Sequence, residues 1–479
     1  MRRNIFAGIA IFAFTLSAFA QTPMSRGDVL RYAFDNSESL SQLKAERERT
    51  EQMRREHQSG AFPQIGADFT YVIMPDLNES RTIPSFSGRI GGMVDGILAE
   101  DSGAEDNERA LAGATRALAG GLDGITSMSA INPTNALSWE LNLMQILFAQ
   151  GKVRTALRIA DIALEIVDLR LEGAKFELAQ NVVNAYNGAL MAQQNRRIQQ
   201  DALAIAEESH RIALARHSAG RGSALDTLNT KLSREQAILR LREAEMRKRL
   251  ALKNLANTAS IENDDIILLD SLSIPQFNMT EEQAWARMQE NNSNLRLIST
   301  LRDMQAEQTN MARTDYRPTV VAFAGLGQTN AFGGGDLSFG DATRWNARIG
   351  LNANVPIWDG GRRRSRMHQA HLLEFEAERG EAQATRGLRL GLAAAFEEYE
   401  VAKQELVQVE QMIVLAQQGF RISQLAFEIG QLTQLELNNS EQNLRMIQLA
   451  LNNAVLNINT AVVGIERLIG EKTLISVNN

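Results

Sequence analysis

One stretch, Val153 to Glu245, most constrains what this chain can fold into. Leucines recur every seventh residue within it, and small or branched residues follow three positions later: Leu157, Leu164, Leu171, Leu178, Ala160, Val167 and Ala174. Such an apolar seam is typical of helices that wrap around one another. The arm before the break at Ala219–Gly222, Lys152–Ser218, has about 67 residues and would be ~100 Å long at 1.5 Å per residue. We therefore predict a long helical hairpin with Gly220 and Gly222 at its turn.

The N-terminus has the pattern of a secretory signal peptide. Arg2 and Arg3 precede an apolar run, Ile5 to Leu16, and Ala18-Phe19-Ala20 supplies a small-x-small cleavage pattern. We predict a signal peptide at residues 1–20, cleaved between Ala20 and Gln21. The alternative, an uncleaved anchor, is disfavoured because the run is too short to span a bilayer. No other stretch approaches eighteen consecutive apolar residues, so a membrane crossing is expected to use strands.

Four shorter segments have the period of β-strands. The first, Ile65 to Ile73, alternates apolar with mostly polar or small residues, and a second is centred on Trp139 to Met144. A third, Val320 to Gln328, is rich in glycine, and the fourth, Trp345 to Val355, alternates most cleanly. These lengths suit tilted bilayer-spanning strands, with Trp139 and Trp345 expected near strand starts at the membrane interface. A soluble sheet with one buried face is the alternative interpretation.

The chain reads as two copies of one pattern. Pro63 and Pro318 differ by 255 positions, as do Asn36-Ser37 and Asn291-Asn292, and further on the offset becomes 210. At that second offset Gly151 matches Gly361, Tyr186 matches Phe396, Gly220 matches Gly430 and Asp226 matches Glu436. We predict a first repeat at residues 21–260 with a long outer loop at 75–134, a linker at 261–280, and a second repeat at 281–479. Each repeat would hold a lead helix (about Asp28–Ser59 and Glu281–Thr314), two strands and a long hairpin.

Four strands cannot close a barrel, and open sheet edges do not survive in lipid. Several chains would therefore share one barrel, and three copies would leave a lumen more readily than two. The polar face of the fourth strand, with Arg344, Arg348, Asn352 and Asn354, is predicted to line that lumen. The contrasting hypothesis is a soluble exported coiled-coil scaffold or periplasmic adaptor-like protein.

This organisation resembles the TolC-like outer-membrane efflux proteins, which serve tripartite efflux pumps and type I secretion systems. The resemblance rests on WNARIGLNANVPIWDGG (Trp345 to Gly361) and on the two tips, FEIGQLTQLELNN (Phe427 to Asn439) and RHSAGRGSALDTLN (Arg216 to Asn229). It implies a mainly α fold with a membrane β-barrel portion: helical hairpins forming an α-barrel, and four strands per chain in a shared, trimeric, twelve-stranded barrel. It also implies a homotrimer in the outer membrane of a Gram-negative-type bacterium, extending into the periplasm. There it would dock onto a periplasmic adaptor protein and an inner-membrane transporter and conduct substrates passively.

The resemblance also assigns roles at the hairpin tips. Acidic residues after the second tip would ring the periplasmic mouth; Glu436 occupies the first such position, whereas the next holds Asn439 instead of an acid. Asp226, at the equivalent place in the first copy, would join this gate. The alternative is that Asp226 and Glu436 are first-turn carboxylates that stabilise their helices through the helix dipole. The expected adaptor contacts are the turn residues Gly220, Arg221, Gly222, Gly430 and Gln431.

The remaining features argue against other functions. No cysteine is present, so disulfides, cysteine-ligated zinc and a lipid anchor on cysteine are not expected. A net charge of −7 gives no reason to expect nucleic acid binding. His368 and His371 could share a helix face but lack a third metal ligand nearby. We expect the basic run Arg362 to Arg366 near lipid head groups, or as a solvated helix start. We find no nucleophile–base constellation and expect neither an enzyme nor a bound cofactor.

Overall fold

The computed structural model describes residues 22–73, 133–149, 151–262, 266–333, 343–429 and 431–475. The chain divides into two compact units, a helical unit and a sheet unit. The helical unit comprises Met1–Arg55, Thr155–Ala312 and Arg364–Asn479, and the sheet unit comprises Glu56–Arg154 and Arg313–Arg363. The predicted loop at 75–134 and the cleavage site at Ala20 and Gln21 lie outside the described residues, apart from Pro133 and Thr134 at the end of the loop.

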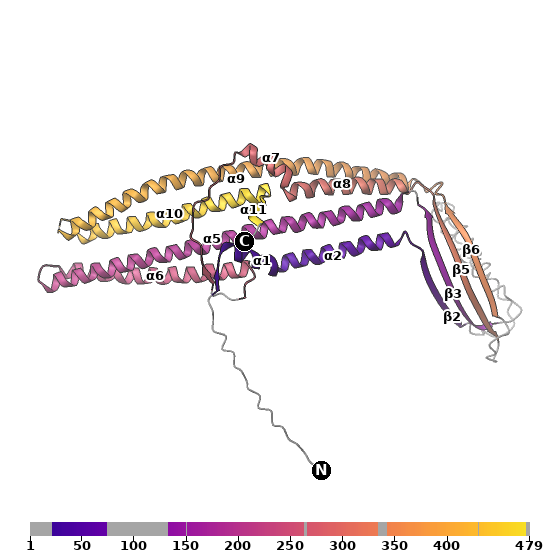
Figure 1. Ribbon diagram of the computed structural model, residues 1–479, viewed down its shortest axis with the longest axis horizontal. Helices are drawn as coiled ribbons and strands as arrows, with labels where there is room; N and C mark the ends of the chain where they lie inside the picture. Colours follow the sequence, from indigo (N-terminus) through magenta and orange to yellow (C-terminus); the bar gives the residue numbers. More distant parts are fainter. Residues whose placement is uncertain are drawn as a thin grey trace, which may run out of the picture. The chain divides into compact units, whose positions relative to one another are not determined.

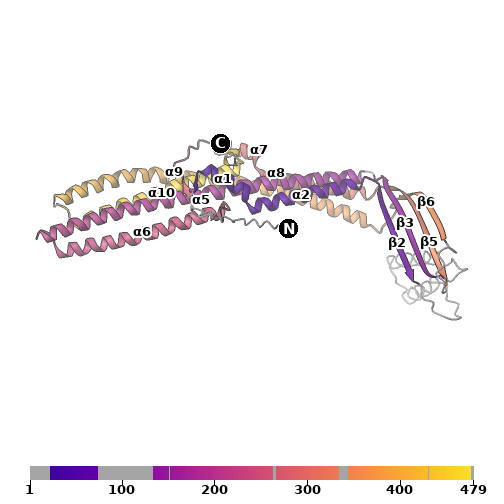
Figure 2. The same cartoon turned by 60° about the horizontal axis from the view of Figure 1, so that its bottom comes forward.

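Nine helices are described, and they include two long hairpins. The first hairpin joins α5 (Lys152–Ser218) to α6 (Ala224–Thr258), and the second joins α9 (Arg362–Glu428) to α10 (Gln434–Ile469). Both outgoing helices have 67 residues, and in both views each return helix lies along its partner (Figures 1 and 2). The shorter helices are α1 (Arg26–Asn36), α2 (Glu38–Ser59), α7 (Glu281–Asn291), α8 (Ser293–Thr314) and α11 (Lys472–Ile475).

The two lead helices are each broken once, where we expected continuous helices. Ser37 has extended backbone (φ −65°, ψ 122°) between α1 and α2, and its hydroxyl accepts a bond from the Leu40 N–H. Asn292 separates α7 from α8 in the same way, and its side-chain oxygen accepts from the Leu295 N–H at 2.8 Å. Short polar side chains compete with the helix for its backbone donors, so one residue ends a helix and caps the next.

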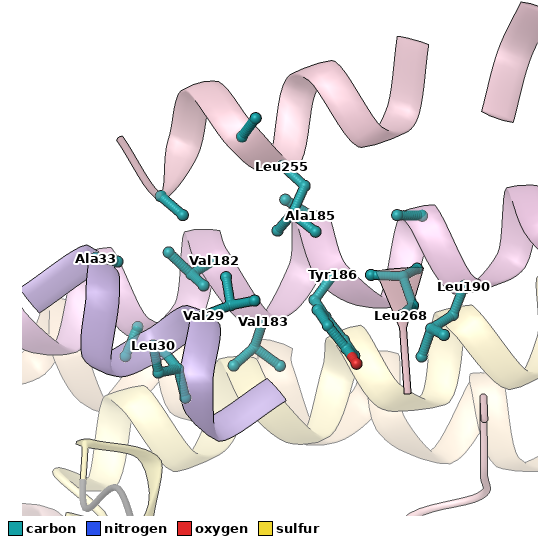
Figure 3. Close-up of a cluster of buried hydrophobic side chains, with 14 of the residues drawn as sticks. Val29, Leu30, Ala33, Val182, Val183, Ala185, Tyr186, Leu190, Leu255 and Leu268 are labelled. Atoms are coloured by element: carbon teal, nitrogen blue, oxygen red, sulfur yellow. The ribbon is translucent and has the colours of Figure 1, made fainter. Parts of the chain in front are cut away.

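Two buried clusters hold the helical unit together, and Figure 3 shows the first. In that cluster Tyr186 of α5 is 1% exposed and packs with side chains from α1, α6 and α10. In the second, Leu392 and Phe396 of α9 pack with Ile458 and Ile465 of α10. The predicted leucine seam of α5 is only half-buried, whereas Ala160 and Val167 beside it are buried.

A small parallel sheet joins the N-terminal segment to the linker, a pairing that no sequence pattern predicted. β1 (Thr22–Met24) pairs with β4 (Ile266–Leu268), with Pro23 opposite Ile267. Ile266 and Leu268 point into the first buried cluster, and Ile267 between them is exposed. Three-residue strands are too short to show a period, so the pairing depends on the core beneath them.

The helix α10 is more apolar than the sequence predicted. Among the described helices, α10 alone is long and apolar enough, by length and composition, to cross a membrane. Ala454, Ile458 and Ile465 of this helix lie in the second buried cluster. We therefore assign α10 as a core helix.

The sheet unit contains one antiparallel sheet of four strands in the order β2-β3-β5-β6 (Figure 2). The strands are β2 (Gln64–Ile73), β3 (Pro133–Phe148), β5 (Thr319–Gly333) and β6 (Thr343–Asn354). β3 and β5 pair along nearly their whole lengths and are longer than their alternation predicted. Trp139 consequently lies well inside β3 rather than near its start.

Candidate functional site: a two-faced sheet and two hairpin tips

The strand register gives the sheet one apolar face. Trp139 of β3 pairs with Phe69 of β2 and with Gln328 of β5, and Gln328 pairs in turn with Trp345 of β6. Because side chains alternate along a strand, these positions and every second residue from them share a face. That face carries Ile65, Phe69, Tyr71, Ile73, Leu141, Leu143, Leu326, Trp345, Ile349 and Leu351, all of which are exposed.

The two tryptophans link three strands on this apolar face. Their rings meet edge to face with centroids 5.7 Å apart. The Trp139 indole N–H donates to the side-chain oxygen of Gln328 at 3.0 Å. Ile349, close by on β6, is 89% exposed. A face this apolar and this exposed is suited to an apolar solvent or to another protein, not to water.

The opposite face of the sheet is polar. All four residues that we predicted to line a lumen, Arg344, Arg348, Asn352 and Asn354, lie on this face of β6. Every charged side chain of the described strands lies there too, since Asp68 and Glu140 share this face with Arg344 and Arg348. The alternation predicted from the sequence therefore holds for most of β2, β3 and β6, whereas β5 carries apolar residues on both faces, Val321 and Phe323 on the polar face and Leu326 on the apolar face.

The first hairpin tip turns at the predicted glycine. Gly220 has φ +68°, a left-handed conformation that favours glycine, and the Arg221 N–H donates to the Arg216 carbonyl at 2.8 Å. Gly222 is needed for space, because a Cβ there would lie 2.9 Å from the His217 nitrogen. Asp226 lies exposed in the first turn of α6.

The second tip ends in a capping box. The Thr433 hydroxyl accepts from the Glu436 N–H at 3.3 Å, and the Glu436 carboxylate accepts from the Thr433 N–H at 2.9 Å and from its hydroxyl at 2.7 Å. These bonds hold the pKa of Glu436 below its ordinary value. Glu436 thus caps the first turn of α10 through hydrogen bonds, and its carboxylate remains exposed. Asn439 and Gln431 are exposed as well, and Gly430 lies outside the described residues.

Contacts between the two hairpins of one chain were not foreseen from the sequence. The Arg216 guanidinium lies over the Phe427 ring, 4.8 Å from its centroid, and so joins α5 to α9. The Asn438 side-chain amide donates to the Ser233 hydroxyl at 3.3 Å, which joins α10 to α6. Side chains on separate helices meet here, so no local sequence pattern could reveal them.

A partly buried charge cluster lies further along the same helices. Glu441 and Arg445 of α10 form an ion pair at 2.7 Å with side chains that are 17% and 11% exposed. Burial raises the pKa of Glu441 and lowers that of Arg445, and Arg240 of α6 is near enough to act on both. Arg240 also lines, with these two residues, a small cavity of about 30 Å³.

Other candidates from the sequence have structural partners. Arg363, in the basic run, donates to Asp359 at 2.8 Å and stacks on Tyr316. His371 pairs with Glu374 on its own helix. Among the described residues, no group of three or more histidine, aspartate or glutamate side chains could hold a metal ion.

Comparison with known proteins identifies the family. The sequence profile described as outer membrane efflux protein matches residues 110–259 and 286–471, more than half of the chain. The chain belongs to the outer membrane efflux protein family. It is an outer-membrane efflux channel, as the resemblance implied. No curated protein gives a significant match to this efflux protein.

Solved structures share the fold at low sequence identity. The CmeC outer membrane channel of Campylobacter jejuni is 18% identical with a TM-score of 0.67; the match covers 93% of this chain and 85% of that one. VceC of Vibrio cholerae is 16% identical with a TM-score of 0.66, covering 93% and 96%. The open state of the MtrE channel of Neisseria gonorrhoeae is 14% identical with a TM-score of 0.68, covering 93% and 88%. The predicted fold class, a mainly helical chain of long hairpins with four strands in one sheet, is confirmed.

Proposed function

We propose that this efflux protein is the exit duct of a tripartite efflux or type I secretion system. Three copies would share one twelve-stranded barrel in the outer membrane, with the apolar face toward lipid and the polar face toward a lumen. The single observation that carries this proposal is the four-stranded sheet itself. Among the described strands, β2 and β6 each pair with a single neighbour, and no exposed backbone edge is tolerated within lipid.

The helical unit supports the same assembly. α6 has an exposed apolar ridge at helical spacing, formed by Leu225, Leu228, Leu232, Leu239, Met246 and Leu250. α9 and its tip have another, formed by Val401, Leu415, Ile422, Leu425 and Ile429. Ridges of this kind are seams for packing against further helices. In a homotrimer they would bring neighbouring copies together as a helical tube extending into the periplasm.

The hairpin tips are proposed to face the periplasmic side. There the turn residues Gly220, Arg221, Gly222, Gly430 and Gln431 would contact an adaptor protein that links the duct to an inner-membrane transporter. Asp226, Glu436 and Asn439 would ring the periplasmic mouth. Replacing Asp226 or Glu436 with alanine should change cation preference or conductance in a planar bilayer. Unchanged values for both variants would exclude them from the mouth.

The remaining organisation is proposed from the same pattern. We propose repeats at 21–260 and 281–479, and the division of the profile match into two segments, 110–259 and 286–471, supports a twofold organisation. A leader at 1–20 would direct export, with the mature chain starting at Gln21, and N-terminal sequencing of the purified protein tests this. The duct itself would carry out no catalysis and would not be anchored through a lipidated cysteine.

Cysteine cross-linking tests the shared barrel, since the chain has no cysteine of its own. Thr70→Cys on β2 would be combined with Asn346→Cys or Asn352→Cys on β6 and oxidised in isolated membranes. At least one pair should give a covalent ladder up to the trimer. The control, Thr70→Cys with Ser138→Cys, joins directly opposite residues within one chain and should give no ladder. If the protein is a monomer that stays soluble without detergent and gives no cross-linked ladder, the proposed duct is wrong and a soluble scaffold is favoured.

A further inference from the structure

A row of polar side chains crosses the polar face of the sheet. The Asn142 amide of β3 donates to the Asp68 carboxylate of β2 at 2.8 Å. The Arg348 guanidinium of β6 donates to the Asn142 side-chain oxygen at 3.3 Å and forms an ion pair with Glu140 of β3. These four residues, which we call the transverse row, connect the two edge strands.

Arg348 reaches β3 across an intervening strand. β5 lies between β3 and β6, and Gly325 of β5 pairs with Asn142 on one side and with Arg348 on the other. A Cβ at Gly325 would lie 2.8 Å from the Glu140 carboxylate oxygen and 2.9 Å from the Arg348 Nε. Real Cβ atoms do not approach so closely, so an alanine here must displace the ion pair. The absence of a side chain at Gly325 therefore leaves room for the Arg348 side chain to cross β5 and reach β3.

A second glycine of β5, Gly327, lies in an equally crowded position. Gly327 pairs with Glu140 and Asn346, and a Cβ there would lie 2.8 Å from the Trp139 carbonyl oxygen. By contrast, Gly66 on the same polar face has no atom within 4 Å of its Cβ position. The glycines of β5 thus serve close packing, whereas Gly66 does not.

The row matters because of its charges. On the polar face of the described strands, Asp68 and Glu140 balance Arg344 and Arg348. The Arg348 side chain is 59% exposed, yet its charge lies beside a carboxylate that is 28% exposed. Fixed charges along a water-filled passage set which small ions enter it.

We propose that the transverse row sets the small-ion selectivity of the duct, with Glu140 holding Arg348 against the wall and neutralising it. This inference depends on the proposed function, in which the polar face lines the passage. Each substitution would act once per chain and hence three times in a trimer. Loss of an acidic member makes the wall more positive and favours anions, and loss of Arg348 favours cations.

Reversal potentials test the charge assignment. The full-length protein would be inserted into planar bilayers under a potassium chloride gradient. Glu140→Gln and Asp68→Asn should shift the reversal potential toward that of chloride, Arg348→Gln toward that of potassium, and the double variant Glu140→Gln/Arg348→Gln should return near wild type. If all of these variants conduct with the wild-type reversal potential, this inference alone is wrong. A wild-type protein that forms no channel would overturn the proposed function instead.

A second measurement tests the pairing itself. Gly325→Ala keeps every charge but obstructs the ion pair, so it should lower the temperature at which the trimer dissociates on a gel. The matched control is Gly66→Ala, which should leave that temperature unchanged. In an Arg348→Ala background the Gly325→Ala penalty should shrink, because one of the two displaced groups is gone. Equal dissociation temperatures for Gly325→Ala and Gly66→Ala would contradict the conclusion that Arg348 crosses β5 at Gly325.

Discussion

The helical unit and the sheet unit bury their apolar residues in different ways. In the helical unit Tyr186 and Leu392 are 1% and 0% exposed, within clusters built entirely from this chain. In the sheet unit no apolar side chain is fully buried among strand residues 64–73, 136–148, 319–330 and 343–354, and Ile349 is 89% exposed. Burial of apolar surface is the dominant stabilising contribution to folding. The helical unit therefore carries its core within one chain, whereas the sheet needs an apolar surrounding.

The largest expected effect comes from opening the helical core. Tyr186→Ala removes a buried ring and leaves Asp270, which accepts from the tyrosine hydroxyl at 2.8 Å, without that donor. We expect a loss of about 3–5 kcal/mol in the free energy of unfolding. Urea unfolding followed by circular dichroism measures this, and Tyr186→Phe, which keeps the ring, should cost only about 1–2 kcal/mol. A cost below that of the phenylalanine variant would show that this cluster is not a core.

The second effect concerns the two faces of the sheet. Ile349→Arg places a charge on the apolar face and should cost about 2–4 kcal/mol if this residue lies near the bilayer midplane. Asn352→Arg, on the polar face of the same strand, should be tolerated. Equilibrium unfolding from lipid vesicles measures both variants. The contrast between the units fails if the two substitutions cost the same.

A smaller effect on stability is expected at the hairpin tips, where the return helices α6 and α10 begin with different N-terminal caps. Thr433→Ala removes a hydroxyl that caps α10 and should lower local stability by about 1 kcal/mol. Hydrogen exchange of the first turn of α10 would report this as faster exchange. Ser223→Ala at the start of α6 removes a single bond, to the Leu225 N–H at 3.1 Å. Faster exchange spread along both hairpins would contradict a local cap.

The same cap should depend on pH. The pKa of Glu436 is lowered in the folded protein by bonds from Thr433, so the ionised carboxylate stabilises the fold. This stabilisation is fully present above the ordinary value of 4.5 and is lost as pH falls through the lowered pKa. Hydrogen exchange at the α10 tip should therefore accelerate in acid, once corrected for intrinsic rates. Glu436→Gln should remove that dependence, and its persistence in this variant would assign it elsewhere.

The smallest effect is expected at the helix surface. Arg47 of α2 and Asp168 of α5 form an ion pair at 2.6 Å with side chains that are 41% and 45% exposed. A double-mutant cycle with Arg47→Ala and Asp168→Ala should give a coupling of about 0–1 kcal/mol, weakened by salt. A coupling comparable to the Tyr186→Ala cost would mean that an exposed ion pair contributes as much to stability as a buried core side chain.

Much of the fold followed from local patterns. The seven-residue seam predicted α5, glycine placed the tip at Gly220, and alternation assigned Arg348 and Ile349 to opposite faces of one strand. Each of these signals depends on neighbours within a few positions, because helix and strand periods are intrinsic to the backbone. Even the resemblance to the family rests on the order of such segments.

What only the tertiary structure decided depends on residues far apart in the chain. The break at Asn292 is accompanied by a bond from its amide to the Leu468 carbonyl at 2.6 Å, and β1 pairs with β4 over a shared core. Gly325 lies in a segment that predicted a glycine-rich strand, but no local pattern indicated that its neighbours in space are Glu140 and Arg348. Local periodicity predicts the face of a helix or strand on which a side chain lies. Only the register between strands and the packing between helices determine which other side chains it contacts there.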